Sequence, residues 1–162
     1  MAIPTSPFDA TKSIYAGLSV IDFTPAGGSS TVFESRLLDI SLDETEQNIK
    51  RPDANGVLRS VRTVVTESTE SMTFEVDEAK RLATDLFGGA LTGRVTGVAT
   101  IWVPDPDDDT GKVALKSEVG FPCTISVEGN IKFGDGDFTK VQLKLVSNKQ
   151  GAITWTVDGL DT

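Results

Sequence analysis

The residues best placed to do chemistry form an acidic run at positions 105–109. Asp105, Asp107 and Asp109 have the spacing of the first three ligands in a calcium-binding loop. The pattern then breaks, because Thr110 stands where the sharp turn requires glycine and Lys116 stands where the bidentate glutamate belongs. We therefore interpret this run as the solvated tip of a hairpin, and we expect no metal site.

The sequence also lacks an activated nucleophile. The chain contains no histidine, which excludes Ser-His-Asp and Cys-His nucleophiles and histidine-bound zinc. Its single cysteine, Cys123, shares the parity of Ile125 and Val127 and is interpreted as a buried core thiol. The glycines neither precede a capped helix nor belong to a Walker motif. We therefore expect that the protein is not an enzyme and binds no cofactor.

Length and composition favour one globular domain. The 162 residues are 38% hydrophobic and 24% charged, and a chain of this length buries roughly two-thirds of its unfolded surface. The net charge of -9 opposes tight binding to nucleic acid phosphates. The opening residues do not have the pattern of a secretion signal. The sequence also contains no run of about 18 apolar residues that could cross a bilayer. We therefore expect a soluble protein that folds in the cytoplasm.

The spacing of apolar residues predicts the elements. Period-two alternation predicts strands over residues 14–20, 72–76, 93–103, 123–133, 141–145 and 153–157, with the last three joined as a meander. Stretches rich in Val, Leu, Ile and Thr predict two further strands over residues 32–42 and 57–67. Helical spacing predicts a short helix over residues 77–87, capped by Asp77 and stopped by Gly88 and Gly89. The polar residues 43–56 are predicted to form a long loop.

These elements predict a mainly β fold with one short α-helix, in which two antiparallel sheets pack as a sandwich or a barrel. We assign the single β domain to residues 13–162. Residues 1–12 contain Pro4 and Pro7 and show no periodicity, so we expect an N-terminal arm there.

The order of the elements resembles that of the major tail tube proteins of long-tailed bacteriophages. The likeness lies in the strand pair that flanks residues 43–56, in the run Glu67-Ser68-Thr69-Glu70-Ser71-Met72-Thr73-Phe74-Glu75-Val76 that leads into the predicted helix, and in the hairpins that follow. It covers most of the chain and rests on element order, size and polar character. The resemblance implies a structural virion protein whose copies close into rings, commonly of six, that stack into a tube through which DNA passes into the host.

Ring closure also fits the physics of open sheets, because a contact repeated around a rotation axis pairs every exposed strand edge. The resemblance implies a larger barrel, completed on ring formation, with strands at residues 32–42, 57–67, 93–103 and 113–118. Parity selects the channel-facing candidates Thr92, Arg94, Thr96, Thr100, Lys116 and Glu118. An acidic channel wall would repel DNA, and the net charge favours one, although several cations lie in these strands.

Two polar loops, residues 43–56 and 104–111, are expected to project along the tube axis and to contact the next ring. The contact candidates are Glu44, Glu46, Lys50, Arg51, Asp53, Asp105, Asp107, Asp108 and Asp109. Exposed ion pairs are individually weak, but a ring repeats each of them many times. Trp102 lies with Val98 on the otherwise polar side of its strand, so we expect either a contact with another subunit or packing under a loop.

The resemblance also implies partners and a location. The partners are further copies of the chain, the tape measure protein, the tail terminator, and baseplate or tip proteins, with viral DNA in transit but not tightly bound and no membrane. The location is the virion tail, after assembly in the bacterial host cytoplasm. Two alternatives remain open. One is another virion assembly protein, such as a capsid decoration protein or a tail terminator, and the other is a monomeric β-sandwich with a ligand pocket.

Overall fold

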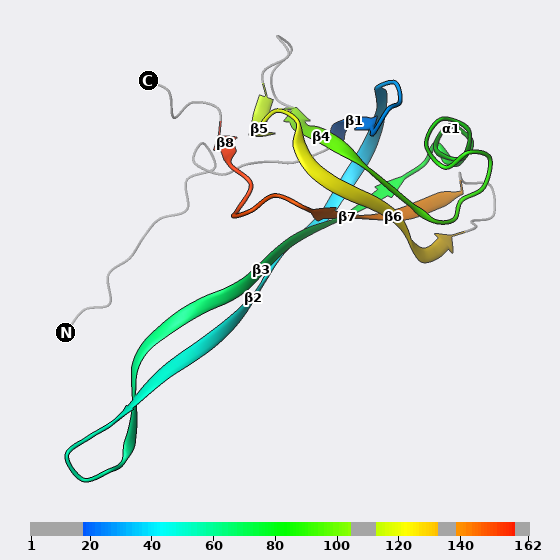
Figure 1. The fold of residues 1–162 in the computed structure, drawn as a ribbon. Helices are drawn as coiled ribbons and strands as arrows, with labels where there is room; N and C mark the ends of the chain where they lie inside the picture. Colours follow the sequence, from blue (N-terminus) through cyan, green and yellow to red (C-terminus); the bar gives the residue numbers. More distant parts are fainter. Residues whose placement is uncertain (1–17, 105–112, 133–138, 158–162) are drawn as a thin grey trace, which may run out of the picture.

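The computed structural model describes residues 18–104, 113–132 and 139–157. The strands are β1 (Ser19–Pro25), β2 (Thr31–Pro52), β3 (Leu58–Val76), β4 (Arg94–Pro104), β5 (Val113–Ser117), β6 (Phe121–Lys132), β7 (Lys140–Ser147) and β8 (Trp155–Val157). A short helix, α1 (Ala79–Arg81), continues into a π-helical turn, η2 (Leu82–Leu86), between β3 and β4. Figure 1 shows a barrel-like body from which a long hairpin of β2 and β3 projects.

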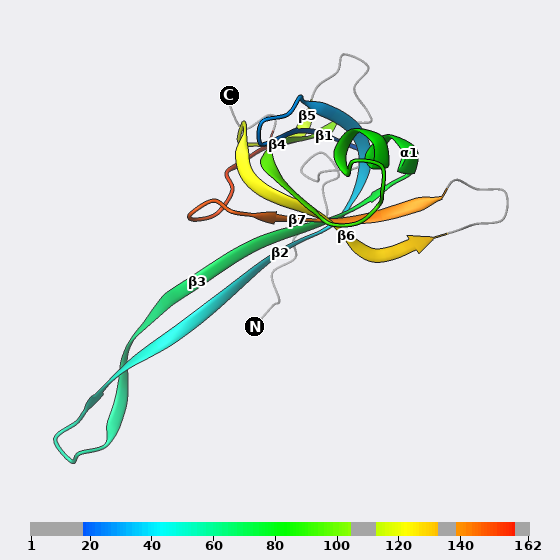
Figure 2. The same ribbon diagram turned by 45° about the vertical axis from the view of Figure 1, so that its right-hand side comes forward.

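The body is a small antiparallel barrel (Figure 2). The strand order β1-β2-β3-β7-β6-β4 returns to its start, because β4 also pairs with β1. At this junction Ile21 of β1 lies opposite Phe33 of β2 on one side and Ile101 of β4 on the other. Strand β5 extends the sheet from β4, and β8 pairs with β5. The prediction of a mainly β, sandwich- or barrel-like fold with one short helix is confirmed.

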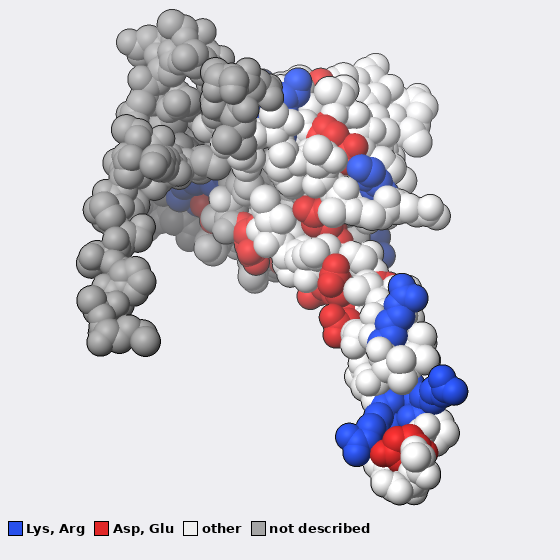
Figure 3. Space-filling view, turned by 90° about the vertical axis from the view of Figure 1, so that its left-hand side faces the viewer, with Lys and Arg blue, Asp and Glu red and all other residues white. Residues whose placement is uncertain are grey.

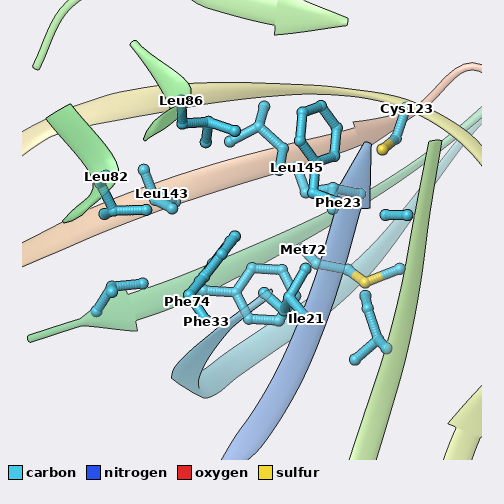
Figure 4. Packing of buried hydrophobic residues seen from close by; sticks show 14 of the residues in the cluster. Ile21, Phe23, Phe33, Met72, Phe74, Leu82, Leu86, Cys123, Leu143 and Leu145 are labelled. Atoms are coloured by element: carbon cyan, nitrogen blue, oxygen red, sulfur yellow. The ribbon is translucent and has the colours of Figure 1, made fainter. Parts of the chain in front are cut away.

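The barrel interior is filled by apolar side chains from every strand of the closed circuit. They are Ile21, Phe23, Phe33, Met72, Phe74, Val76, Ala99, Ile101, Phe121, Cys123, Ile125, Val141, Leu143 and Leu145. Figure 4 shows Leu82 and Leu86 reaching this cluster from the helical segment. Burial raises the pKa of the Cys123 thiol to about 12, which confirms its interpretation as an inert core residue.

The helical segment begins differently from its prediction but ends where it was predicted to end. Asp77 does not cap it, because the N-cap is Glu78 and no side chain caps the helix, while the Asp77 carboxylate lies 3.7 Å from the Arg36 guanidinium. The predicted stop is confirmed, since Gly88 and Gly89 adopt positive φ angles of 67° and 105° that favour glycine. No helix in the described part of the chain is long and apolar enough to cross a bilayer.

The face of the first strand that packs inward was predicted incorrectly. We expected Leu18 and Val20 to face the core, but Leu18 is exposed and the neighbouring Ser19 is buried with Ile21. Ser19 tolerates this position because its hydroxyl lies 2.8 Å from that of Ser35 on β2, so a buried polar group is hydrogen-bonded. Residues 14–17 of the predicted strand lie outside the described residues.

The pairing of the last strand was also predicted incorrectly. Strands β6 and β7 form the expected hairpin, but β8 pairs with β5 and not with β7. The chain turns away from β7 because two distant carboxylates hold the segment before β8. Glu70 accepts a hydrogen bond from Ile153 N at 2.8 Å, and Glu118 accepts one from Thr154 N at 3.2 Å.

The predicted long loop over residues 43–56 is wrong. Strands β2 and β3 stay paired through this region, from Arg36 opposite Glu75 to Pro52 opposite Leu58, and only a short turn joins them. In that turn the Asp53 carboxylate accepts hydrogen bonds from Asn55 N at 2.9 Å and from Val57 N at 3.0 Å. The loop prediction failed because both faces of this ribbon are exposed, so its strands show no regular two-residue alternation of apolar and polar residues.

Candidate assembly surface

The hairpin arm, residues 39–52 of β2 and 58–70 of β3, carries an apolar stripe along one face. Opposed residues of an antiparallel pair share a face, so the register places this stripe on the side that continues the core face of the barrel. We define the apolar face of the arm as Ile40, Leu42, Leu58 and Val65, which are 39%, 50%, 63% and 46% exposed. Glu44, Glu46 and Lys50 lie between them on the same face.

An apolar face of this kind is costly to leave in water. Complete burial of one Val, Leu or Ile side chain is worth about 1.5–3 kcal/mol, and a two-stranded ribbon is marginally stable without a packing partner. Other large exposed apolar residues of the hairpin are Ile49 on the opposite face of the arm, Val57 in the turn and Val61. Beyond Glu70, which the segment before β8 contacts, the arm projects away from the barrel in Figures 1 and 2. Exposed apolar residues gathered in this way are typical of interaction surfaces, so the arm is a candidate interface.

The opposite face of the arm is charged, and the charges are sorted by sign along its length. Near the barrel lie the residues that we call the acidic root, Asp39, Asp43 and Glu67. Near the turn lie the residues that we call the basic tip, Arg51, Arg59 and Arg62. Figure 3 shows Lys and Arg gathered around a small acidic patch at the end of the arm, with further Asp and Glu closer to the barrel.

The contact candidates from the predicted loop therefore fall into three groups. Glu44, Glu46 and Lys50 belong to the apolar face, and Arg51 belongs to the basic tip. Asp53 lies in the turn, where its ion pair with Arg59 at 2.7 Å, together with two backbone hydrogen bonds, holds the pKa of its carboxyl below the ordinary value. The remaining candidates, Asp105, Asp107, Asp108 and Asp109, lie outside the described residues.

Backbone hydrogen-bonding groups are unpaired along several strand edges of the described chain, two of them in the arm and one in β6. Residues 36–52 of β2 pair with β3 alone, and residues 58–70 of β3 pair with β2 alone. Residues 127–132 of β6 pair with β7 alone, because the pairing with β4 ends at Ser126. Such edges are templates for pairing with another chain.

The channel-facing candidates do not form a single surface. Arg94 and Thr96 lie with β6 and β7 on a polar outer face, where an open groove is lined by Arg94, Thr124, Ser126, Lys144 and Asn148. Thr92 is exposed in the loop before β4. Thr100 is buried and accepts a hydrogen bond from Gly120 N at 2.9 Å, so it does not belong to an exposed wall.

The last two candidates lie on or beside β5, away from that groove. Lys116 places its ammonium 5.7 Å from the centre of the Trp102 ring, and Trp102 is partly buried. Glu118 forms an ion pair of 2.5 Å with Lys149, which holds the pKa of the Glu118 carboxyl below its ordinary value. A contact between Trp102 and another subunit stays a prediction.

Polar residues of β6 and β7 were missing from the candidates chosen from the sequence. Thr124, Ser126 and Lys144 share the outer face with Arg94, and the hydroxyls of Thr96 and Thr124 lie 3.2 Å apart. Their alternation with buried residues was visible in the sequence. The missing information was which strands are neighbours, since the pairing of β4 with β6 is not local in the chain.

Comparisons with solved structures find components of contractile injection systems. A chain of the PVC sheath-tube complex in the extended state, from an extracellular contractile injection system, matches with a TM-score of 0.49 and 12% identity, over 91% of this chain and 94% of that chain. The tube terminating cap of the anti-feeding prophage (AFP) gives 0.44 and 12%, over 97% and 99%. The 6-fold symmetrised AFP baseplate gives 0.45 and 13%, over 99% and 100%. No protein-family model matches the sequence, and no curated protein matches it significantly. These values assign no role to any residue of this chain.

Proposed function

We propose that this chain is the structural subunit of a phage tail tube, whose copies close into rings that stack around a DNA channel. The observation that carries the proposal is the apolar face of the arm. Ile40, Leu42, Leu58 and Val65 extend the core face of the barrel beyond the barrel itself. A sheet from another copy is the cover that fits such a face, because two sheets pack through their apolar sides.

The open edges supply a route to ring closure. Strands β2, β3, β7 and β6 form a continuous sheet whose outer edges are residues 36–52 of β2 and 127–132 of β6. When the β2 edge of one copy pairs with the β6 edge of the next, a closed ring leaves neither edge free. Strand β4 is occupied by β6 on one side and by β1 on the other, so this proposal replaces β4 and β5 with β6 and β7 as barrel strands.

The polar outer face of the protomer barrel, which would line the inside of the proposed ring, suits a channel that does not retain DNA. Hydroxyl groups of Thr124, Ser126 and Thr73 recur across it, and its lysines lie close to carboxylates. Lys144 lies 3.8 Å from Glu128, and Lys140 lies 3.9 Å from Glu75. A cation that is already paired neutralises phosphate less well, so DNA would gain little affinity from this wall. We therefore propose a wall of hydroxyl groups and paired lysines that also contains Arg94, in place of a uniformly acidic one.

In this role the chain would reside in the virion tail after assembly in the bacterial host cytoplasm. Its further partners would be the tape measure, terminator and baseplate or tip proteins. Six copies per ring and a non-enzymatic role belong to the same proposal.

Negative-stain microscopy and sedimentation of the purified chain test the proposal. We expect rings and tubes from the unmodified chain, and folded protomers without either from the double variant Leu42→Thr with Leu58→Thr. The matched control is Val119→Thr, since Val119 is 76% exposed in a turn away from the arm. This control should assemble normally.

Three outcomes would contradict the proposal. Small closed oligomers that never stack would favour a terminator or decoration protein, and featureless monomers would favour a ligand-binding domain. Normal tubes from the Leu42→Thr, Leu58→Thr variant would show that the apolar face is not the interface.

A further inference from the structure

Within one chain, the acidic root and the basic tip of the arm lie too far apart to form ion pairs with each other. Eight residues separate Asp43 of the acidic root from Arg51 of the basic tip, which at about 3.3 Å per residue is roughly 26 Å of strand. The Debye length at physiological salt is about 8 Å, so the two regions are screened from each other. Of the arm's exposed charges, only Asp53 and Arg59 form an ion pair with a described residue.

The basic tip also contains a repulsive pair. Arg51 lies directly opposite Arg59 in the β2–β3 register, and like charges in this position destabilise a ribbon. Arg62 lies on the same face, opposite Ile49. Asp53 binds one of these guanidinium groups in the turn, which leaves Arg51 and Arg62 without a carboxylate partner among the described residues. An acidic surface on a partner would stabilise this arrangement.

The acidic root of another copy has the matching charge and size. Asp39 and Asp43 are four residues apart, or about 13 Å along the strand, and Glu67 lies diagonally across from Asp43. Arg59 and Arg62 are three residues apart, or about 10 Å along theirs. Both patches lie on the same face of the arm.

We propose that the basic tip of each arm docks on the acidic root of an arm in the neighbouring ring. This inference rests on the proposed function and specifies how rings recognise each other. Because stacked rings share one orientation, the tip of one copy meets the root of the next, and this heterologous contact continues from ring to ring. Ring closure by strand edges depends little on salt, whereas stacking through exposed charges weakens as salt rises.

Charge reversal tests this inference with the full chain. The tip variant combines Arg51→Glu with Arg62→Glu, and the root variant combines Asp43→Lys with Glu67→Lys. Each variant alone should form rings but lose the pelletable tubes. An equal mixture should recover tubes, because each reversed, acidic tip can then meet a reversed, basic root, and each native tip can meet a native root. A chain carrying all four substitutions should form tubes by itself.

The outcomes separate this inference from the proposed function. Tubes of normal length from either variant alone would overturn the inference, and so would intact rings from both variants that fail to stack on mixing. A native chain that forms no rings would overturn the proposed function and this inference with it. Should a reversed variant misfold, the neutral pair Arg51→Gln with Arg62→Gln gives the same test, and normal stacking of that pair would count against the inference.

Discussion

The carboxylate of Glu70, where the arm leaves the barrel, lies 3.4 Å from the indole nitrogen of Trp155 in β8 and accepts its hydrogen bond. The other carboxylate oxygen accepts the backbone hydrogen bond from Ile153 at 2.8 Å. Glu70 is only 8% exposed, so these two donors satisfy a buried charged group. The segment before and at the start of β8 is thereby fastened to the base of the arm, two parts of the chain more than eighty residues apart.

Replacing Glu70 with Ala should destabilise the protomer by about 1–3 kcal/mol, because two donors lose their acceptor in a buried position. Glu70→Gln keeps an acceptor oxygen and should cost less. Denaturant unfolding followed by tryptophan fluorescence measures both effects. The control is Glu67→Ala on the exposed part of the same strand, and an equal cost for Glu67→Ala and Glu70→Ala would refute the role of the buried site.

Gly97 should be essential for closing the barrel between β1 and β4. It lies opposite Pro25, and a Cβ at this position would come within 2.1 Å of the Thr24 carbonyl oxygen and 2.9 Å of the Phe23 ring. Gly97→Ala must therefore displace backbone, and we expect a loss of about 1–3 kcal/mol or more in unfolding free energy. In the control Gly28→Ala, the nearest atom is 3.3 Å away in the Pro25 ring. Similar melting temperatures for the two variants would contradict this account.

The ion pair between Glu118 and Lys149 should give stability that depends on pH. The hydrogen bond from Lys149 lowers the pKa of the Glu118 carboxyl in the folded state. A carboxyl with a lowered pKa contributes stability above its unfolded value, which is about 4.3 for glutamate, and loses it as the pH falls through the folded value. Glu118→Gln should therefore melt lower than the native chain at neutral pH, with the difference shrinking in acid. A difference in melting temperature that stays constant with pH would contradict the role of this ion pair. An equal effect of Glu34→Gln would contradict it as well.

The elements that the sequence predicted correctly share one physical property. Each has one side in the barrel core and one side in solvent, so burial imposes a two-residue period that can be read without a structure. Residues 72–76 and 141–145 show this most clearly, since Met72, Phe74, Leu143 and Leu145 all face inward. The short helix was equally visible, because Leu82 and Leu86 must both reach the core.

The parts that were missed lack that constraint. In the arm, burial within the protomer selects no face, so Asp43 and Glu44 can follow each other in a strand as freely as in a loop. The position of β8 depends on Glu70 and Glu118, which are distant in the sequence from the segment they hold. The turn itself could be recognised from the sequence, because Asp53 and Asn55-Gly56 are typical turn residues. The strands on either side of the turn could not, because their residues show no regular alternation.

The arm should be the least stable part of the isolated protomer and become protected on assembly. Its ribbon has no core on either face, so its backbone hydrogen bonds can open without unfolding the barrel. Hydrogen exchange should be fast for residues 43–50 and 60–67 in dispersed protomers, while Leu143 and Ile101 in the barrel exchange slowly. In assembled tubes the same arm amides should become protected, because a neighbouring copy covers the apolar face and pairs the free edge of β2. The Leu42→Thr, Leu58→Thr variant provides the control, since its arm should stay exposed at the same protein concentration. Arm amides that are already protected in the native monomer would mean that the ribbon needs no partner, and the case for assembly through this face would fail.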